Sequence, residues 1–260
     1  MPARLAPAFL SRPLAHRGLH DAAAGVIENS AAAVRAAVAA GYGVEIDLQL
    51  SADGEAMVFH DDALDRLTEA TGLLHARPAA ELRRLTLRGG SEGIPTFADV
   101  LEIMSGTGLP LLVEIKRQHD DVDVGPLESR TADLLAGHDG PAAVMSFNPY
   151  SVLWFRDHAP AIPRGLTAED FDRDTQAAHI APETRKSLAA LETFDEAEAD
   201  FVSYRWDHLP RPETEALRAR GIPVLCWTTR AAAEGRAALR HADNVTFEGY
   251  RPETPTPDPH

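Results

Sequence analysis

Two histidines of the chain each end a short apolar run and are each followed by charged residues. His16 lies in LAHRGLHD, residues 14–21, and His60 lies in MVFHDD, residues 57–62. Imidazole suits proton exchange near neutral pH because its unperturbed pKa is about 6.5. Two such groups in one site could take a proton from an attacking hydroxyl and give one to a leaving alkoxide. A lone histidine after an apolar run is more often structural, so the pair indicates chemistry only together with its neighbours.

Three carboxylates lie in strand-like runs elsewhere in the chain. Glu45 and Asp47 belong to VEID, between the two histidines, and Glu114 belongs to VEIK. Side chains two residues apart on a strand share one face, so Glu45 and Asp47 should point the same way. Burying both is costly unless a cation or hydrogen bonds compensate them. Each acid alone could also form a salt bridge, as Glu114 could with Lys116.

These acids together predict a divalent metal site. Three carboxylates completed by water suit Mg²⁺ or Ca²⁺, which prefer oxygen ligands. Zn²⁺ more often takes thiolate or imidazole ligands, and it stays open as an alternative.

Two cations accompany these groups in an otherwise acidic protein. Arg17 follows His16 and can place its planar fork on phosphate oxygens, and Lys116 adds a second positive charge. The formal net charge is -15, and the sequence has no basic block, which argues against nucleic-acid binding. A metal and a few local cations would still let this chain bind a small anionic substrate.

Strand-like and helix-like runs alternate along the chain. About eight strand candidates in a repeated strand–helix order predict an α/β fold, a (β/α)8 TIM barrel. A doubly wound open sheet is the alternative, although no glycine-rich dinucleotide or phosphate loop supports it. The expected strands are residues 13–16, 43–50, 57–60, 110–116, 142–147, 163–168, 199–204, 222–227 and 243–247, and the expected helices lie within 28–41, 97–106, 149–159, 211–221 and 230–242.

One domain, residues 1–252, is expected to carry the whole constellation. Residues 61–97 are less regular and indicate a small insertion of loops and one short helix. Residues 253–260 are rich in proline and polar side chains, so we expect a disordered tail.

The sequence also favours a soluble, cytoplasmic protein. The N-terminus lacks the apolar core of a signal peptide, and no stretch approaches the ~20 apolar residues of a membrane span, so no stable membrane insertion is expected. Cys226 is the single cysteine and lies in the apolar run IPVLCW, which predicts a buried structural thiol. The oligomeric state is not predicted.

Several motifs together resemble one known family. AHRG, EN, VEIDLQLSADGEAMVFHDD, LDRLT, VEIK, MSFNP and CWTTR are similar to motifs of the glycerophosphodiester phosphodiesterase family, and the resemblance runs from about residue 13 to residue 252. The specific part is the His-Arg-Gly and His-Asp pair separated by Glu-x-Asp and Asp-Gly.

The resemblance implies a TIM barrel with a small insertion after its second strand. It also implies hydrolysis of small glycerophosphodiesters to sn-glycerol 3-phosphate and an alcohol. Whether a substrate hydroxyl attacks first, giving a cyclic phosphate, or water attacks directly stays open. By motif position, the resemblance assigns acid–base catalysis to His16 and His60, the metal to Glu45, Asp47 and Glu114, phosphate contacts to Arg17 and Lys116, the metal or glycerol edge to Glu28, and packing against the glycerol carbons to Trp227.

Two departures from the family pattern stand out. Ile27 replaces the usual proline before Glu28 and Asn29, which is a mild change. The last strand reads VTFEGYRP, residues 245–252, where many members have Thr-Asp-x-Pro. We expect that change to touch none of the proposed chemistry.

Other residues near the motifs have two possible roles. His20, Asp21 and His75 are expected to be mainly solvated loop residues. The residues Phe147, Asn148, Arg205 and Trp206 follow strands and could either shape the substrate pocket or form surface corners.

Two other functions remain possible at this stage. A phospholipase C or D acting on intact lipids would usually present an apolar lip or a basic patch, and neither is evident in this acidic chain. A non-catalytic binding barrel should have lost some of the two histidines and three acids, and all five are present.

Overall fold

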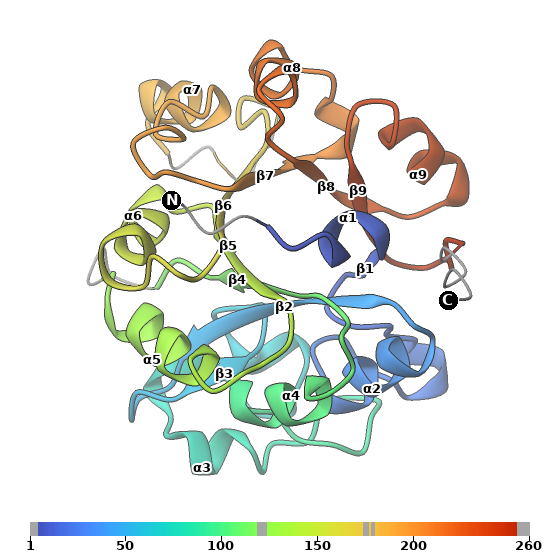
Figure 1. The fold of residues 1–260 in the computed structure, drawn as a ribbon. Coiled ribbons are helices and arrows are strands. Elements are labelled where there is room, and N and C mark those ends of the chain that lie inside the picture. The colour runs from blue at the N-terminus through green and yellow to red at the C-terminus, as the bar shows by residue number, and fades with distance from the viewer. Residues whose placement is uncertain (1–4, 119–123, 174–176, 178–179, 254–260) are drawn as a thin grey trace.

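The computed structural model describes residues 5–118, 124–173, 177 and 180–253. Eight parallel strands form a barrel in the order β1-β9-β8-β7-β6-β5-β4-β2, and pairing of β1 with β2 closes the ring (Figure 1). The predicted TIM barrel is therefore confirmed, and the open-sheet alternative is wrong. The strands are β1 (Leu14–Ala15), β2 (Gly43–Leu50), β4 (Leu111–Ile115), β5 (Ala142–Ser146), β6 (Arg164–Ala168), β7 (Phe201–Arg205), β8 (Val224–Thr229) and β9 (Asn244–Phe247). A ninth strand, β3 (Ala56–Val58), pairs antiparallel with β2.

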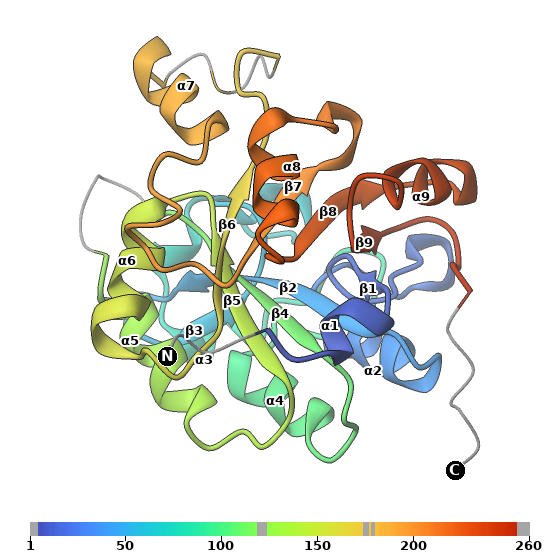
Figure 2. The same cartoon turned by 45° about the horizontal axis from the view of Figure 1, so that its top comes forward.

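Helices surround the barrel (Figures 1 and 2). They are α1 (Ala8–Ser11), α2 (Ala31–Ala39), α3 (Ala79–Leu82), α4 (Phe97–Met104), α5 (Pro126–Leu135), α6 (Pro149–His158), α7 (Pro182–Ala189), α8 (Pro212–Ala219) and α9 (Ala232–Ala238). Local capping fixes several starts: the Ser30 hydroxyl accepts from the Ala33 amide at α2, and Thr96 and Asp99 form a reciprocal capping box at α4. Sequence patterns missed α1, α5 and α7, because α1 is a single turn and at least half of the residues in the other two are polar.

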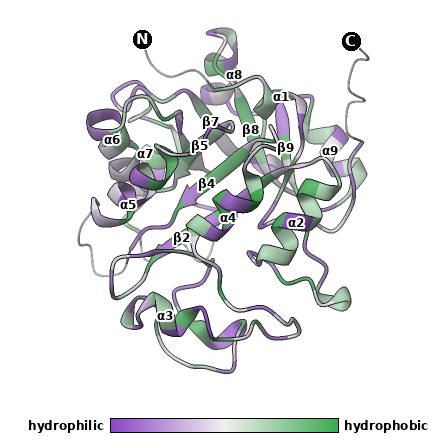
Figure 3. Cartoon of the chain, turned by 60° about the horizontal axis from the view of Figure 1, so that its bottom comes forward, coloured by the Kyte–Doolittle hydropathy of each residue, from purple (hydrophilic) through white to green (hydrophobic). Residues whose placement is uncertain are grey.

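Two apolar layers hold the barrel together. The larger layer fills the space between the strands and the outer helices, and in Figure 3 helix α4 accordingly shows both hydrophobic and hydrophilic residues. The second layer lies inside the barrel at the N-terminal ends of the strands, where Phe9 of α1 packs with Leu14, Leu112 and Phe201. This inner plug leaves the opposite end of the barrel, where the strands end, for polar side chains.

Residues 51–96 form a small lobe between β2 and α4. Besides β3 and α3, the lobe contains the 3-10 helices η2 (Leu64–Arg66) and η3 (Leu74–Ala76). It has its own buried cluster, the lobe cluster, made of Ile27, Met57, Phe59, Leu64, Leu67, Leu74, Ala79, Leu82, Leu87 and Ile94. The lobe includes most of the segment expected as an insertion, and it has two 3-10 turns in addition to the one short helix expected.

Two further expectations concern membranes and the C-terminus. Within the described ranges, no helix has the length and apolar character that crossing a membrane requires. The tail expected over residues 253–260 lies outside the described residues except for Glu253, which is exposed.

Gly165 of β6 gives a test of the barrel interior. A Cβ built at this glycine would lie 2.4 Å from the Phe201 ring, which belongs to the inner plug. We expect Gly165→Ala to lower the free energy of unfolding by about 1–3 kcal/mol, as overpacked core sites do, measured by denaturant titration. Gly137→Ala is the control, because its Cβ would meet only Leu134 O at an ordinary 3.8 Å. Equal losses in the two variants would contradict the packing argument.

Candidate active site

The polar end of the barrel contains one cavity of about 290 Å³. Most of its lining side chains come from the C-terminal parts of the strands or from just beyond their ends, which is where TIM barrels place their active sites. The cavity is lined by His16, Arg17, Glu45, Asp47, His60, Glu114, Lys116, Met145, Phe147, Glu169, Arg205, Trp227 and Thr246. The structure thus brings eight of the nine site residues singled out in the sequence into one place. Glu28, the ninth, reaches this group through Arg17.

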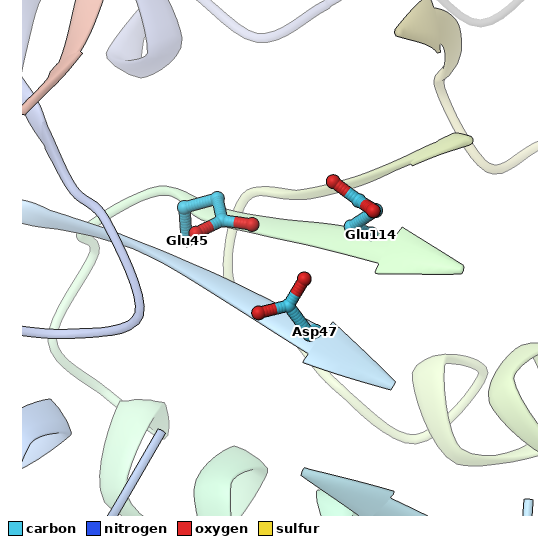
Figure 4. A group of neighbouring side chains, drawn as sticks. All are labelled: Glu45, Asp47 and Glu114. Atoms are coloured by element: carbon cyan, nitrogen blue, oxygen red, sulfur yellow. The ribbon is translucent and has the colours of Figure 1, made fainter. Parts of the chain in front are cut away.

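Glu45, Asp47 and Glu114 form a buried acidic cluster. Each offers a carboxylate oxygen, and these oxygens all lie within 4.8 Å of one another. Glu45 and Asp47 point the same way from β2, and Glu114 joins them from β4, where it stands opposite Asp47 in the strand register (Figure 4). A donor set of carboxylate oxygens is the kind that Mg²⁺ and Ca²⁺ prefer, so these residues could hold such an ion.

The charges around the cluster are unevenly compensated. The Lys116 ammonium lies 3.0 Å from Glu114 Oε1 and 3.7 Å from Asp47 Oδ1. Burial opposes ionisation of Asp47, but the positive charges of Lys116, His60 and Arg17 hold its pKa below the usual value. Burial and the negative charges of Asp47 and Glu114 instead raise the pKa of Glu45 well above its usual value. The ionised form of Glu45 is therefore poorly compensated, and a bound divalent cation would favour it.

Arg17 is held in an unusual backbone conformation that turns it toward the acids. Its φ is 55°, its amide donates to Glu45 Oε2 at 2.9 Å, and its Nε lies 3.3 Å from Asp47 Oδ2. Gly18 follows with φ 77°, and a Cβ there would lie 2.7 Å from the Ala33 backbone. The chain therefore needs glycine after Arg17, which gives the His-Arg-Gly motif a structural reason.

Glu28 and Asn29 support this arrangement from the loop before α2. Arg17 Nη1 donates to Glu28 Oε1 at 2.7 Å. Asn29 Nδ2 donates to Asp47 Oδ2 at 2.9 Å, and Asn29 Oδ1 accepts from the Asp47 amide at 3.3 Å. Asn29 was named in the sequence only as part of the EN motif, yet it orients one of the three acids.

His16 forms a close pair with Glu248, just beyond the end of β9. The His16 Nδ1 atom lies 2.6 Å from Glu248 Oε2, and Nε2 lies 4.0 Å from Glu45 Oε2. Because a carboxylate accepts, Nδ1 carries the hydrogen and Nε2 is left toward the acidic cluster. Burial lowers the pKa of His16, although the bond to Glu248 works against that shift. The hydrogen bond from His16 is in turn the main cause of a lowered pKa at Glu248.

The expectation that the changed end of the last strand touches none of the proposed chemistry is therefore wrong. Glu248 lies in that VTFEGYRP stretch and contacts His16 directly. The available signal was its place: a carboxylate immediately after a barrel strand lies where site residues gather.

His60 forms a second histidine–carboxylate pair. Its Nδ1 atom lies 2.7 Å from Asp61 Oδ1, and Gln49 Nε2 donates to the backbone oxygens of His60 and Asp61 at 3.0 and 2.5 Å. The His60 side chain is 32% exposed and that of His16 only 13%, so His60 lies nearer the solvent side of the cavity. Sequence reasoning named both histidines but missed the carboxylate that each one bonds.

The wall across from the acids is aromatic with one ion pair. Phe147 and Trp227 meet edge to face with ring centroids 5.4 Å apart, and the Trp227 indole donates to Ser203 O at 3.1 Å. Arg205 Nη1 donates to the buried Glu169 at 3.0 Å. Phe147 and Arg205 therefore belong to the pocket rather than to a surface corner.

The remaining candidates are placed elsewhere. Asn148 caps α6 through the Tyr150 amide, and Asp21 caps a 3-10 turn at residues 22–24. Trp206 packs against the apolar layer outside the barrel, and His75 lies in η3 of the lobe. The His20 Nε2 atom lies 3.8 Å from Glu248 Oε2. Burial raises the pKa of the Cys226 thiol to about 12, as for a structural cysteine.

Comparison with known proteins identifies related sequences and folds. The Glycerophosphoryl diester phosphodiesterase family matches residues 16–245. A glycerophosphodiester phosphodiesterase of Caldanaerobacter subterraneus is 29% identical over 163 residues, which cover 59% of this chain and 65% of that protein. The family match contains both histidines and all three acids, and it ends before Glu248.

Solved structures share the fold along nearly the whole chain. An Oleispira antarctica phosphodiesterase in complex with the product sn-glycerol-3-phosphate has a TM-score of 0.75 at 25% identity, over 92% of this chain and 93% of that chain. A glycerophosphodiester phosphodiesterase from Thermotoga maritima has a TM-score of 0.68 at 22% identity, over 90% of this chain and 92% of that chain.

The His16–Glu248 pair gives a test that is independent of activity. Glu248→Gln keeps a hydrogen-bond acceptor but removes the charge that favours the imidazolium. We therefore expect the pKa of His16 to fall below its value in the unchanged protein, measured by NMR titration of both proteins without added metal. The resonance of His241, which lies near Glu215 instead, serves as an internal reference. A pKa of His16 that stays the same or rises would contradict the proposed coupling.

Proposed function

Because the chain belongs to the glycerophosphoryl diester phosphodiesterase family, we propose that it releases sn-glycerol 3-phosphate and an alcohol from glycerophosphodiesters, using two histidines and a divalent cation. Its enzyme class is that of the phosphoric diester hydrolases. The observation that carries the proposed mechanism is the convergence of two histidine–carboxylate pairs and three buried acids on one cavity. The product seen in the Oleispira antarctica relative supports a small glycerophosphodiester as substrate.

The two histidines take opposite roles in this proposal. His16 is the deeper one, and its lowered pKa favours the neutral imidazole, so its Nε2 accepts the proton of the attacking hydroxyl. As that oxygen bonds to phosphorus, the bond from phosphorus to the alcohol oxygen breaks. His60, on the more exposed side, gives its proton to the leaving oxygen. The attacking oxygen comes from water or from a neighbouring hydroxyl of the substrate. In the second case the pair exchanges roles while water opens the cyclic phosphate.

The three acids provide the metal site of the proposal. Glu45, Asp47 and Glu114 would hold Mg²⁺ or Ca²⁺, because every donor is a carboxylate oxygen. The ion, when bound, supplies positive charge that polarises the phosphoryl oxygens. Arg17 and Lys116 already face the cluster and would add phosphate contacts.

Two more side chains complete the substrate site. Glu28 would act at its edge through Arg17, and Trp227 would pack its ring against the glycerol carbons. We also propose that residues 1–252 form a single domain, with residues 61–97 as an insertion.

Removing either imidazole should abolish most of the activity. We expect His16→Ala and His60→Ala each to lower the release of glycerol 3-phosphate from glycerophosphocholine by about 10²- to 10⁴-fold. A coupled assay for glycerol 3-phosphate measures the rate, and His241→Ala, remote from the cavity, serves as the control. Full activity in both variants would refute the assigned roles. Turnover of phospholipid vesicles without turnover of the deacylated ester would instead indicate an enzyme for intact lipids.

Removing the metal should act through the acidic cluster. Chelation should abolish turnover, and added Mg²⁺ or Ca²⁺ should restore it. Independently of activity, the ion at about 100 times its Kd should raise the free energy of unfolding by about 2.7 kcal/mol. Asp47→Asn should lose most of that gain, whereas Glu102→Gln, an exposed acid on α4, should keep it. Calorimetry showing equal metal affinity in Asp47→Asn and the unchanged protein would rule out this site.

A further inference from the structure

Arg66 joins two parts of the site without being among the described residues that line the cavity. It lies at the end of η2 in the lobe, and its side chain is 47% exposed. Its Nε and Nη2 atoms donate to both oxygens of Asp61 at 2.5 and 2.9 Å. Its Nη1 and Nη2 atoms donate to both oxygens of Glu28 at 2.9 and 2.7 Å. One planar fork therefore grips two carboxylates, each through both of its oxygens.

Each of these carboxylates holds a side chain of the cavity. Asp61 bonds His60 Nδ1 at 2.7 Å, and Glu28 bonds Arg17 Nη1 at 2.7 Å. The contacts form a continuous chain from His60 through Asp61, Arg66 and Glu28 to Arg17. Arg66 is the middle member of that chain.

Arg66 is needed because its positive charge holds two negatively charged side chains close together. Asp61 and Glu28 share one guanidinium, so without it two carboxylates would face each other across the gap. The pKa of Glu28 lies below its usual value because its bonds from Arg66 and Arg17 outweigh the effect of burial. Without Arg66, Asp61 would be free to turn toward solvent, and the His60 ring would lose the partner that fixes its Nδ1 hydrogen.

The lobe cluster packs next to three of these residues, namely Glu28, His60 and Arg66. Ile27 precedes Glu28, Phe59 precedes His60, and Leu67 follows Arg66, and all three apolar side chains are buried in that cluster. The Arg66 carbonyl also accepts from Arg88 Nη1 at 3.2 Å. The backbone at Arg66, and at the residues that it connects, is therefore held by buried neighbours.

We propose that Arg66 is a positioning residue for His60 and Arg17. Its fork on Asp61 and Glu28 fixes the imidazole and the guanidinium that face the substrate. Arg66 thereby contributes to catalysis without contacting the reacting atoms. This inference rests on the proposed function, in which His60 protonates the leaving alcohol.

If Arg66 only stabilised the fold, its loss would lower the Tm rather than act on catalysis alone. Arg66 is half-exposed, and ion pairs of exposed side chains contribute little to stability. Arg66→Ala should therefore melt close to the Tm of Arg83→Ala, which removes another exposed arginine of the lobe, one that bonds Asp99 of α4 outside the cavity. Only the Arg66 variant should affect catalysis.

The experiment compares two substrates with different needs for a proton. Glycerophosphocholine releases an alkoxide that must be protonated, whereas glycerol 3-phosphate p-nitrophenyl ester releases a nitrophenolate that needs no proton. We expect Arg66→Ala to lower kcat on glycerophosphocholine up to about 100-fold, as misplaced catalytic groups do, and to change KM much less. The nitrophenyl ester should lose far less kcat. Arg66→Lys should recover only part of the loss, because an ammonium cannot grip both carboxylates through a planar fork.

His60→Ala, measured beside these variants, separates the two levels of the proposal. If His60→Ala lowers kcat equally on both substrates, the role assigned to His60 fails, and the inference about Arg66 fails with it. His60→Ala could instead lower kcat mainly on glycerophosphocholine while Arg66→Ala lowers kcat equally on both substrates, or on neither. In that case Arg66 does not position His60. Matching selectivity in the two variants, with Arg83→Ala unchanged, supports the inference.

Discussion

Three buried carboxylates on two adjacent strands set the central constraint of this protein. Glu45, Asp47 and Glu114 have too little positive charge around them, so the chain must bring cations to that end of the barrel. Lys116 directly follows the strand that carries Glu114, and Arg17 reaches in from the loop after β1. The positive φ of Arg17 and the glycine after it follow from that need. The cations that compensate the acids can also bind a phosphodiester. The same groups therefore balance the buried charge and form a binding surface.

Each catalytic candidate also depends on a carboxylate behind it. Glu248 holds His16 and Asp61 holds His60, in both cases through Nδ1, which leaves the other ring nitrogen for the cavity. Arg66 extends this principle outward, because it holds the carboxylate rather than the ring. Proton transfer at the phosphate would thus depend on the residues that hold the two rings in place.

Much of the fold was readable because its signals are local. Strand-like runs predicted the positions of β2 and the later strands to within a few residues, and a helix-like run predicted α2. The residue types at strand ends identified most of the cavity. The supporting bonds were not readable, because Glu248 lies 232 residues from His16 in sequence and only closure of the barrel brings them together. Arg66 was visible only as part of the LDRLT motif, since nothing local shows that its fork faces Glu28.

The pairing of β1 with β9 has a consequence for folding during synthesis. His16 directly follows the first barrel strand and Glu248 directly follows the last, so the pair cannot form until residue 248 has left the ribosome. A growing or prematurely ended chain could already contain the acids and both imidazoles, yet its first histidine would lack its partner. Synthesis beyond residue 248 is thereby a condition for the finished site.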